Sequence, residues 1–76
     1  MWLKTRNDSL INLDHVREIS ARDTYLMVTY AADGRQEVVC TYADEESATR
    51  GLSDLAELII DTHSIPFADN NVVFEV

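Results

Sequence analysis

Residues 44–63 read DEESATRGLSDLAELIIDTH, and this stretch decides the fold. Its apolar residues recur three or four positions apart, which is typical of one face of an amphipathic helix. They are Ala48, Leu52, Leu55 and Ile59, with Ala56 and Leu58 widening the stripe. Asp44 is suited to cap the helix N-terminus, and Pro66 prevents the helix from continuing. We therefore predict a helix over about 44–62.

Before this helix, short β-prone runs alternate with polar turns. We predict strands over 2–5, 10–13, 16–22, 25–31 and 36–42. The dipeptide Asp33-Gly34 is the strongest hairpin signal, and Val38, Cys40 and Tyr42 are expected to share one face of their strand.

After the helix, 65–71 is expected to be a loop, and 72–76 a β-prone tail that pairs within the chain or with a neighbour. The expected fold is α+β, an antiparallel β-meander of four to five strands packed against one amphipathic helix (about 44–62), with a short C-terminal β-tail. The chain is read as a single domain, 1–76. Its sheet occupies 1–42, its helix 43–63, and a loop and C-terminal strand 64–76.

A chain of 76 residues forms a thin core, because a domain of this size buries only about 60–65% of its unfolded surface. Small domains often add a disulfide, a metal or a partner subunit. Cys40 is the only cysteine, which excludes an internal disulfide and fits a reducing, cytoplasmic setting. A partner subunit is therefore the expected supplement.

The net charge of −8 is unevenly distributed along the chain. Residues 1–42 carry five basic and six acidic groups, whereas residues 43–76 carry one basic and eight acidic groups. An acidic half of this kind repels phosphate, so we expect no nucleic-acid partner and no membrane partner.

Gly51 is unusual because glycine inside a helix costs about 1 kcal/mol relative to alanine. It points towards the apolar stripe, where a small residue lets a neighbour approach closely. That neighbour is either the chain's own sheet or a helix from a second subunit. We assign a candidate self-association interface to the stripe and the tail, with the residues Gly51, Leu55, Val72 and Phe74.

Few residues indicate catalytic or metal chemistry. Asp14 and His15 adjoin at a turn, where Asp14 is expected to bind a local backbone N–H. Asp61 and His63 lack the i, i+4 spacing of helical metal ligands. The run Asp44-Glu45-Glu46 suits a helix start better than a calcium loop. We predict no catalytic, cofactor-binding or metal residues, and no cofactor.

Cys40 is expected to be a buried small apolar residue rather than a reactive thiol. The aromatic residues are assigned to core and edge packing rather than to base stacking, because basic residues are few and scattered. They are Trp2, Tyr25, Tyr30, Tyr42, Phe67 and Phe74.

Three segments carry a family resemblance: Met1-Trp2-Leu3-Lys4-Thr5, Leu10-Ile11-Asn12-Leu13-Asp14, and Tyr42-Ala43-Asp44-Glu45-Glu46-Ser47-Ala48. The chain resembles a group of small, functionally uncharacterised bacterial and phage proteins with a similar opening and helix start. Its Ile65-Pro66-Phe67 and Phe74-Glu75-Val76 match their tails loosely. The resemblance implies a β-meander with a helix and an intracellular setting, and it carries over no site residues.

The sequence leaves three functions open. The first is a non-enzymatic interaction module that associates with itself. The second is an acidic inhibitor that mimics nucleic acid and captures a basic protein, with Glu45, Glu46 and Glu57 among its charges. The third is a minor metal-binding or enzymatic role resting on His15, His63 and scattered carboxylates.

Overall fold

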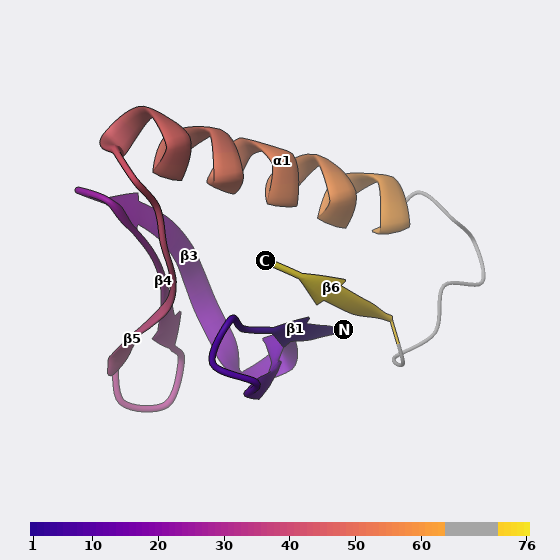
Figure 1. Cartoon of the computed structure of the whole chain (residues 1–76). Helices are drawn as coiled ribbons and strands as arrows, with labels where there is room; N and C mark the ends of the chain where they lie inside the picture. The colour runs from indigo at the N-terminus through magenta and orange to yellow at the C-terminus, as the bar shows by residue number, and fades with distance from the viewer. Residues whose placement is uncertain (64–71) are drawn as a thin grey trace.

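The computed structural model describes residues 1–63 and 72–76, with one helix, α1 (Glu45–His63), above two small sheets (Figure 1). The Ser47 N–H donates to Oδ1 of Asp44 at 2.7 Å, which is the N-cap bond expected from the sequence. The predicted helix is confirmed to within one residue at each end. The predicted loop at 65–71, with Pro66 and Phe67, lies outside the described residues.

One sheet is an antiparallel meander of three consecutive strands, β3 (Val16–Arg22), β4 (Tyr25–Tyr30) and β5 (Gln36–Thr41). Both connections have the left-handed backbone that tight hairpins require: Asp23 has a φ of 52° and Gly34 a φ of 72°. Glycine adopts this conformation without the steric cost that a side chain brings. The hairpin predicted at Asp33-Gly34 is confirmed.

The other sheet joins the two ends of the chain, with strand order β2-β1-β6. Strands β1 (Trp2–Lys4) and β2 (Leu10–Asn12) form the predicted hairpin, and β6 (Val73–Glu75) adds to β1 in parallel. The C-terminal tail therefore pairs within its own chain. A short 3-10 turn, η1 (Leu13–His15), leads from β2 into β3.

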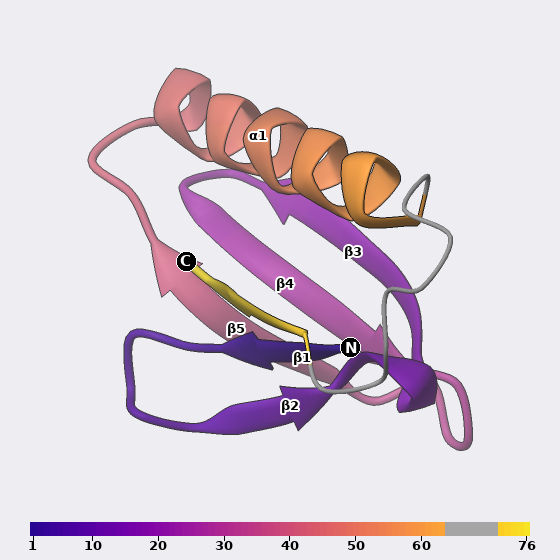
Figure 2. The same cartoon turned by 90° about the vertical axis from the view of Figure 1, so that its right-hand side faces the viewer.

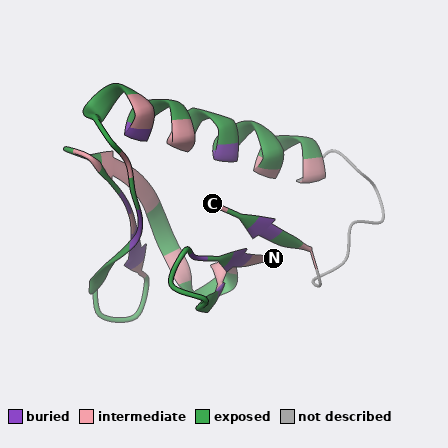
Figure 3. Cartoon of the chain, in the orientation of Figure 1, coloured by how far each residue is buried: buried purple, intermediate pink, exposed green. Residues whose placement is uncertain are grey.

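The two sheets lie on one side of α1, and the helix covers the inner face of β3 and β4 (Figures 1 and 2). The buried parts of α1 and of the strands face one another across this space (Figure 3). The core is made by residues from both sheets and from the helix: Leu3, Ile11, Leu26, Val28, Val39, Cys40, Leu55 and Phe74. This arrangement confirms an α+β fold, with the six strands of the described residues divided between two three-stranded sheets.

Strand β5 departs from the predicted alternation because it contains a β-bulge. Leu26 pairs with Cys40 and Met27 with Val38, so Val39 is an extra residue in the ladder. Val39 and Cys40 are both buried, whereas Val38 is 38% exposed. The prediction that Val38 and Cys40 share a face was wrong, because a period-two argument cannot foresee an inserted residue.

The apolar stripe of α1 is narrower than predicted. Ala48 and Leu55 are buried, but Ala56 is exposed and Leu58 is 50% exposed. The sheets beneath the helix are small and cover only a strip of its surface. Leu58 is left at the margin, where it borders the groove described next.

Candidate functional site

A groove of about 290 Å³ runs along α1 and is bounded on its other side by the end of β6. We call it the α1–β6 groove. Its walls are formed by Tyr42, Ser47, Arg50, Gly51, Asp54, Leu55, Leu58, Glu75 and Val76. The helical members lie three or four positions apart, so they share one face of α1. The groove is thus a product of helix periodicity and of the tail that folds back beneath it.

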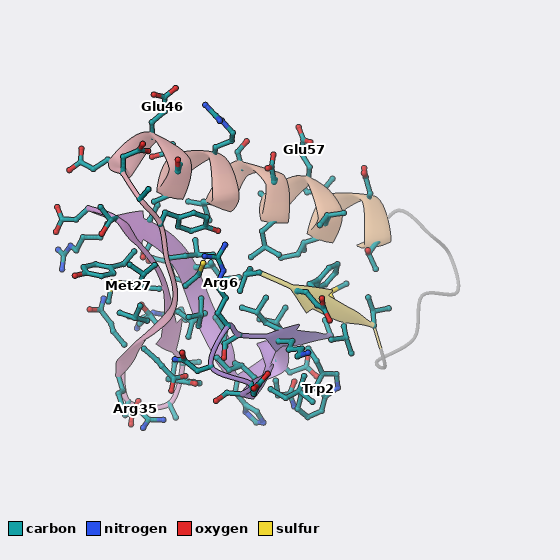
Figure 4. The ribbon with its side chains drawn as sticks, in the orientation of Figure 1. Trp2, Arg6, Met27, Arg35, Glu46 and Glu57 are labelled. Carbon is teal, nitrogen blue, oxygen red and sulfur yellow. The ribbon has the colours of Figure 1, made fainter. Side chains whose placement is uncertain are left out.

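Tyr42 lines this groove, and its ring packs against Gly51. A Cβ atom at Gly51 would overlap with the Tyr42 hydroxyl and would lie 2.5 Å from Cζ. The close neighbour predicted for Gly51 is therefore a side chain of its own chain. The Arg6 guanidinium, which points towards α1 in Figure 4, stacks 5.2 Å from the Tyr42 ring centroid.

Burial is the main cause that raises the pKa of Tyr42, and the neighbouring Cys40 thiol adds to it. Asp54 also raises this pKa through its negative charge, while Arg6 opposes the rise. Tyr42 therefore stays protonated at neutral pH, and its ring is a neutral wall of the groove.

Not every charged side chain that lines the groove has an ion-pair partner among the described residues. Arg50 pairs with Glu46 at 3.1 Å, and Lys4 pairs with Glu75 at 3.8 Å. Asp54 has no ion pair with any described residue. The surplus negative charge of the groove is therefore located at Asp54.

A second feature is the face of β3–β4–β5 that points away from α1. The cross-strand register places on this face Glu18, Ser20, Arg22, Tyr25, Met27, Thr29, Gln36, Val38 and Thr41. We call it the outer face. Tyr25 is 40% exposed, and Val38 lies opposite the half-buried Met27. Helix α1 and the second sheet lie on the other side, and the labelled Met27 points away from β1 and β6 (Figures 2 and 4).

The outer face differs in charge from the rest of the chain. Among the side chains that the register places on this face, only Glu18 and Arg22 are charged and their charges cancel, whereas the whole chain has a net charge of −8. Acidic residues gather instead along α1, where Glu46 and Glu57 point away from both sheets (Figure 4). These two acidic residues therefore point away from the sheets (Figure 4).

A wider hollow of about 450 Å³ lies at the opposite end of the first sheet, beside Asp14, His15 and Asp33. Its Tyr30 hydroxyl donates to Oε2 of Glu37 at 2.6 Å, and this hydrogen bond is the main cause that raises the pKa of Tyr30. No three His, Cys, Asp or Glu side chains within residues 1–63 and 72–76 are placed to share a metal ion.

The turn before this hollow is capped differently from the prediction. The Asp14 N–H donates to Oδ1 of Asn12 at 3.0 Å, so Asn12 rather than Asp14 supplies the capping side chain. The prediction missed this because Asn and Asp side chains bind a backbone N–H equally well. The sequence alone does not show at which of the two residues the turn begins.

The four residues predicted to form an interface lie together around α1 and β6. Leu55 is 3% exposed and Phe74 6% exposed, and both belong to the core of their own chain. Val72 is half-buried, and its carbonyl accepts the Trp2 N–H at 2.8 Å. Gly51 lines the groove, so its surroundings come from the same chain. Association through these four residues stays a prediction.

Sequence reasoning did not assign Met27, Val38 or Asp54 to a candidate site. Alternation along β4 could have placed Met27 on the face that Leu26 and Val28 do not share. Its cross-strand partner Val38 could not be predicted, because the bulge in β5 shifts the register. Asp54 gave no signal, because one acidic residue among many on a helix is ordinary.

In the described part of the chain, no helix has the length and apolar character needed to cross a membrane. Comparison of the chain with protein-family models, with curated proteins and with solved structures gave no match.

Proposed function

We propose that this chain is a non-enzymatic interaction module that binds a second copy of itself through the outer face of β3–β4–β5. The observation that carries the proposal is a face with an apolar centre that neither α1 nor the second sheet covers (Figure 2), on a strongly acidic chain. Tyrosine and methionine are residue types enriched in interface cores, and charged residues are typical of the rim. Tyr25, Met27 and Val38 supply the centre, with Glu18 and Arg22 at the rim.

Charge favours this face over the others for self-association. Two chains of net charge −8 repel each other wherever their acidic surfaces meet. Contact through the outer faces keeps both helices on the far sides of the dimer. A two-fold axis perpendicular to the strands and passing level with Ser20 would place Glu18 of one copy near the partner's Arg22.

The size of the face sets the expected strength. Three strands about 4.8 Å apart, each using about five residues, present a face of roughly 15 by 17 Å. Such an interface belongs to the small class, below about 1,200 Å² in total, whose complexes are weak. We expect a weak dimer that forms only with increasing concentration.

Sedimentation equilibrium over a range of concentrations tests the proposal. The wild type should approach twice the 8.6 kDa mass of one chain, and Val38→Lys should remain monomeric because it buries an unpaired charge. Ile60→Lys is the matched control, since Ile60 is 66% exposed but lies on α1. A mass of 8.6 kDa at every concentration, or equal loss in both variants, would contradict the proposal.

A charge exchange gives an independent check. Glu18→Arg and Arg22→Glu should each weaken the dimer through like-charge contacts, and the double variant should recover it. Failure of the double variant to recover would place the contact elsewhere.

The acidic face of α1 supports a second candidate, capture of a basic protein. Glu46 and Glu57 lie on the outward side of the helix and face solvent (Figure 4). Capture on immobilised basic protein should fall steeply with added salt, because surface charges are screened. It should also fall when Glu45, Glu46 and Glu57 are changed to glutamine. Binding that is unaffected by added salt and by the three glutamine substitutions would exclude this function.

A further inference from the structure

We propose that the open edge of β6 and the α1–β6 groove beside it bind an extended peptide segment that carries a lysine or arginine side chain. The segment adds to β6 as a further strand. This site is separate from the outer face and does not depend on self-association.

On one side of β6, the backbone groups have no strand partner among residues 1–63 and 72–76. The Trp2 N–H donates to the Val72 carbonyl, and the Val76 N–H donates to the Lys4 carbonyl. In a parallel pair, alternate residues turn their backbone groups towards the neighbour. The intervening residues Val73 and Glu75 therefore turn their N–H and C=O groups away from β1. Since β6 ends the order β2-β1-β6, no described strand pairs with that side.

Of these two residues, Glu75 borders the groove, whereas Val73 lies just beyond its lining. Glu75 and Val76 form its wall on the β6 side, and α1 forms the opposite wall. In Figure 1, β6 lies between α1 and β1, with its edge away from β1 turned towards the helix. A strand edge beside an apolar groove combines backbone pairing with pockets for alternate side chains, as in peptide recognition by strand addition.

The length of the groove matches a short extended segment. From Ser47 to Leu58 the helix rises about 16 Å, at 1.5 Å per residue. About five residues in extended conformation cover the same distance, at about 3.3 Å each. Leu58 offers an apolar contact for a side chain of the segment, because it is 50% exposed and lines the groove.

The surplus charge selects the chemistry of the segment. Arg50 and Glu75 already pair with Glu46 and Lys4, which leaves Asp54 without an ion pair among the described residues. A lysine or arginine on the segment supplies the missing cation. A second copy of the chain does not, because pairing two β6 edges would bring both Asp54 and both Glu75 carboxylates close to the same axis.

Titration of the ¹⁵N-labelled chain with the peptide acetyl-Thr-Val-Lys-Val-Thr-amide tests the proposal. The amide signals of Val73 and Glu75 should shift with increasing peptide, and their exchange with solvent should slow. N-methylation of the alternate peptide positions that face β6 should abolish binding. N-methylation of the other positions should leave it intact, because those N–H groups face away.

Variants of the two groove walls sharpen the test. Leu58→Gln should weaken the peptide several-fold, whereas Ile60→Gln should not, because Ile60 is an exposed apolar residue of α1 outside the groove lining. Asp54→Asn should weaken the lysine peptide about two- to fivefold, the range of an exposed ion pair, and should not affect the same peptide with norleucine in place of lysine. Glu57→Gln, on the outward side of α1, serves as the charge control.

Three results would overturn the proposal. They are no shift at β6 with millimolar peptide, shifts that fall on the outer face instead, and pairing of β6 with β6 of a second copy in the absence of peptide. The Val38→Lys variant separates this site from the proposed dimer, since it should lose self-association and keep peptide binding.

Discussion

The two sheets of this chain are built in opposite ways. Sheet β3–β4–β5 joins consecutive strands through tight turns, and each strand pairs with its neighbour in sequence. Sheet β2–β1–β6 gains its third strand only when the C-terminal tail pairs with β1, where Trp2 lies opposite Val73. The first sheet depends on local signals, whereas the second depends on a core that brings the chain ends together. The difference teaches that an N-terminal hairpin of three-residue strands needs the tail to complete its sheet.

Phe74→Ala should have the largest effect on this comparison. Phe74 is 6% exposed and packs with Leu3 and Leu55 in the shared core, so its truncation should cost about 3–5 kcal/mol in the free energy of unfolding. Urea unfolding followed by circular dichroism measures the loss. This is a large part of the stability expected for a small domain, about 5–15 kcal/mol.

Hydrogen exchange in the same variant tests whether the two sheets unfold as one unit. Because the core contains residues of both, amides of β4 should lose protection together with those of β1. Val28→Ala, in the first sheet, is the matched variant and should give the same pattern. Protected β4 amides beside exchanging β1 amides would show two independent units.

Gly51→Ala should have the next largest effect and an unusual sign. Alanine normally stabilises a helix interior by about 1 kcal/mol relative to glycine. Here the new methyl group would overlap with Tyr42, so we expect a loss of about 1–3 kcal/mol in the free energy of unfolding.

The double variant Gly51→Ala with Tyr42→Ala separates this clash from a backbone effect. Removing the ring frees the space, so the combined loss should be smaller than the sum of the two single losses. Additive losses would show that Tyr42 is not the obstacle.

Thr5→Val tests the turn that connects β1 and β2, and a smaller effect is expected. Thr5 is 5% exposed, and its hydroxyl accepts the N–H groups of Asn7 at 3.3 Å and Ser9 at 3.2 Å. Losing these bonds should cost about 1 kcal/mol. Thr41→Val, at an exposed position of β5, should change the unfolding midpoint little. A neutral Thr5→Val would mean that the turn holds without its side-chain bonds.

The sequence was sufficient for elements whose signals are local. The helix, its Asp44 cap and the Asp33-Gly34 hairpin all follow from a few adjacent residues. The parallel pairing of β6 could not be predicted, because Val73 and Glu75 contain nothing that specifies a partner distant in sequence. The bulge at Val39 is also invisible to alternation, since both faces of β5 carry valine.

The candidate sites follow the same division. Gly51 stood out because glycine is rare inside a helix. Its contact with Tyr42 could not be predicted, because it depends on how the residue that follows β5 packs beneath α1. The outer face and the groove depend on which surfaces other elements leave uncovered. That is a property of the assembled fold, and no residue pattern in one segment encodes it.

The smallest effect concerns the local part of the fold, at the Asp44 cap. The Ser47 N–H bond holds the pKa of Asp44 below its ordinary value, so the folded chain binds this proton less readily than the unfolded chain. The stabilising contribution is therefore fully present above the unfolded pKa, about 4, and is lost as pH falls through the lower folded pKa.

Asp44→Asn keeps a capping oxygen but does not titrate, so its Tm should lie slightly below that of the wild type at neutral pH. That gap should close in acid, whereas Glu57→Gln, on the exposed side of α1, should show no matching convergence. A wild-type advantage that stays undiminished as the pH falls through both pKa values would mean that the Asp44 charge does not stabilise the start of α1.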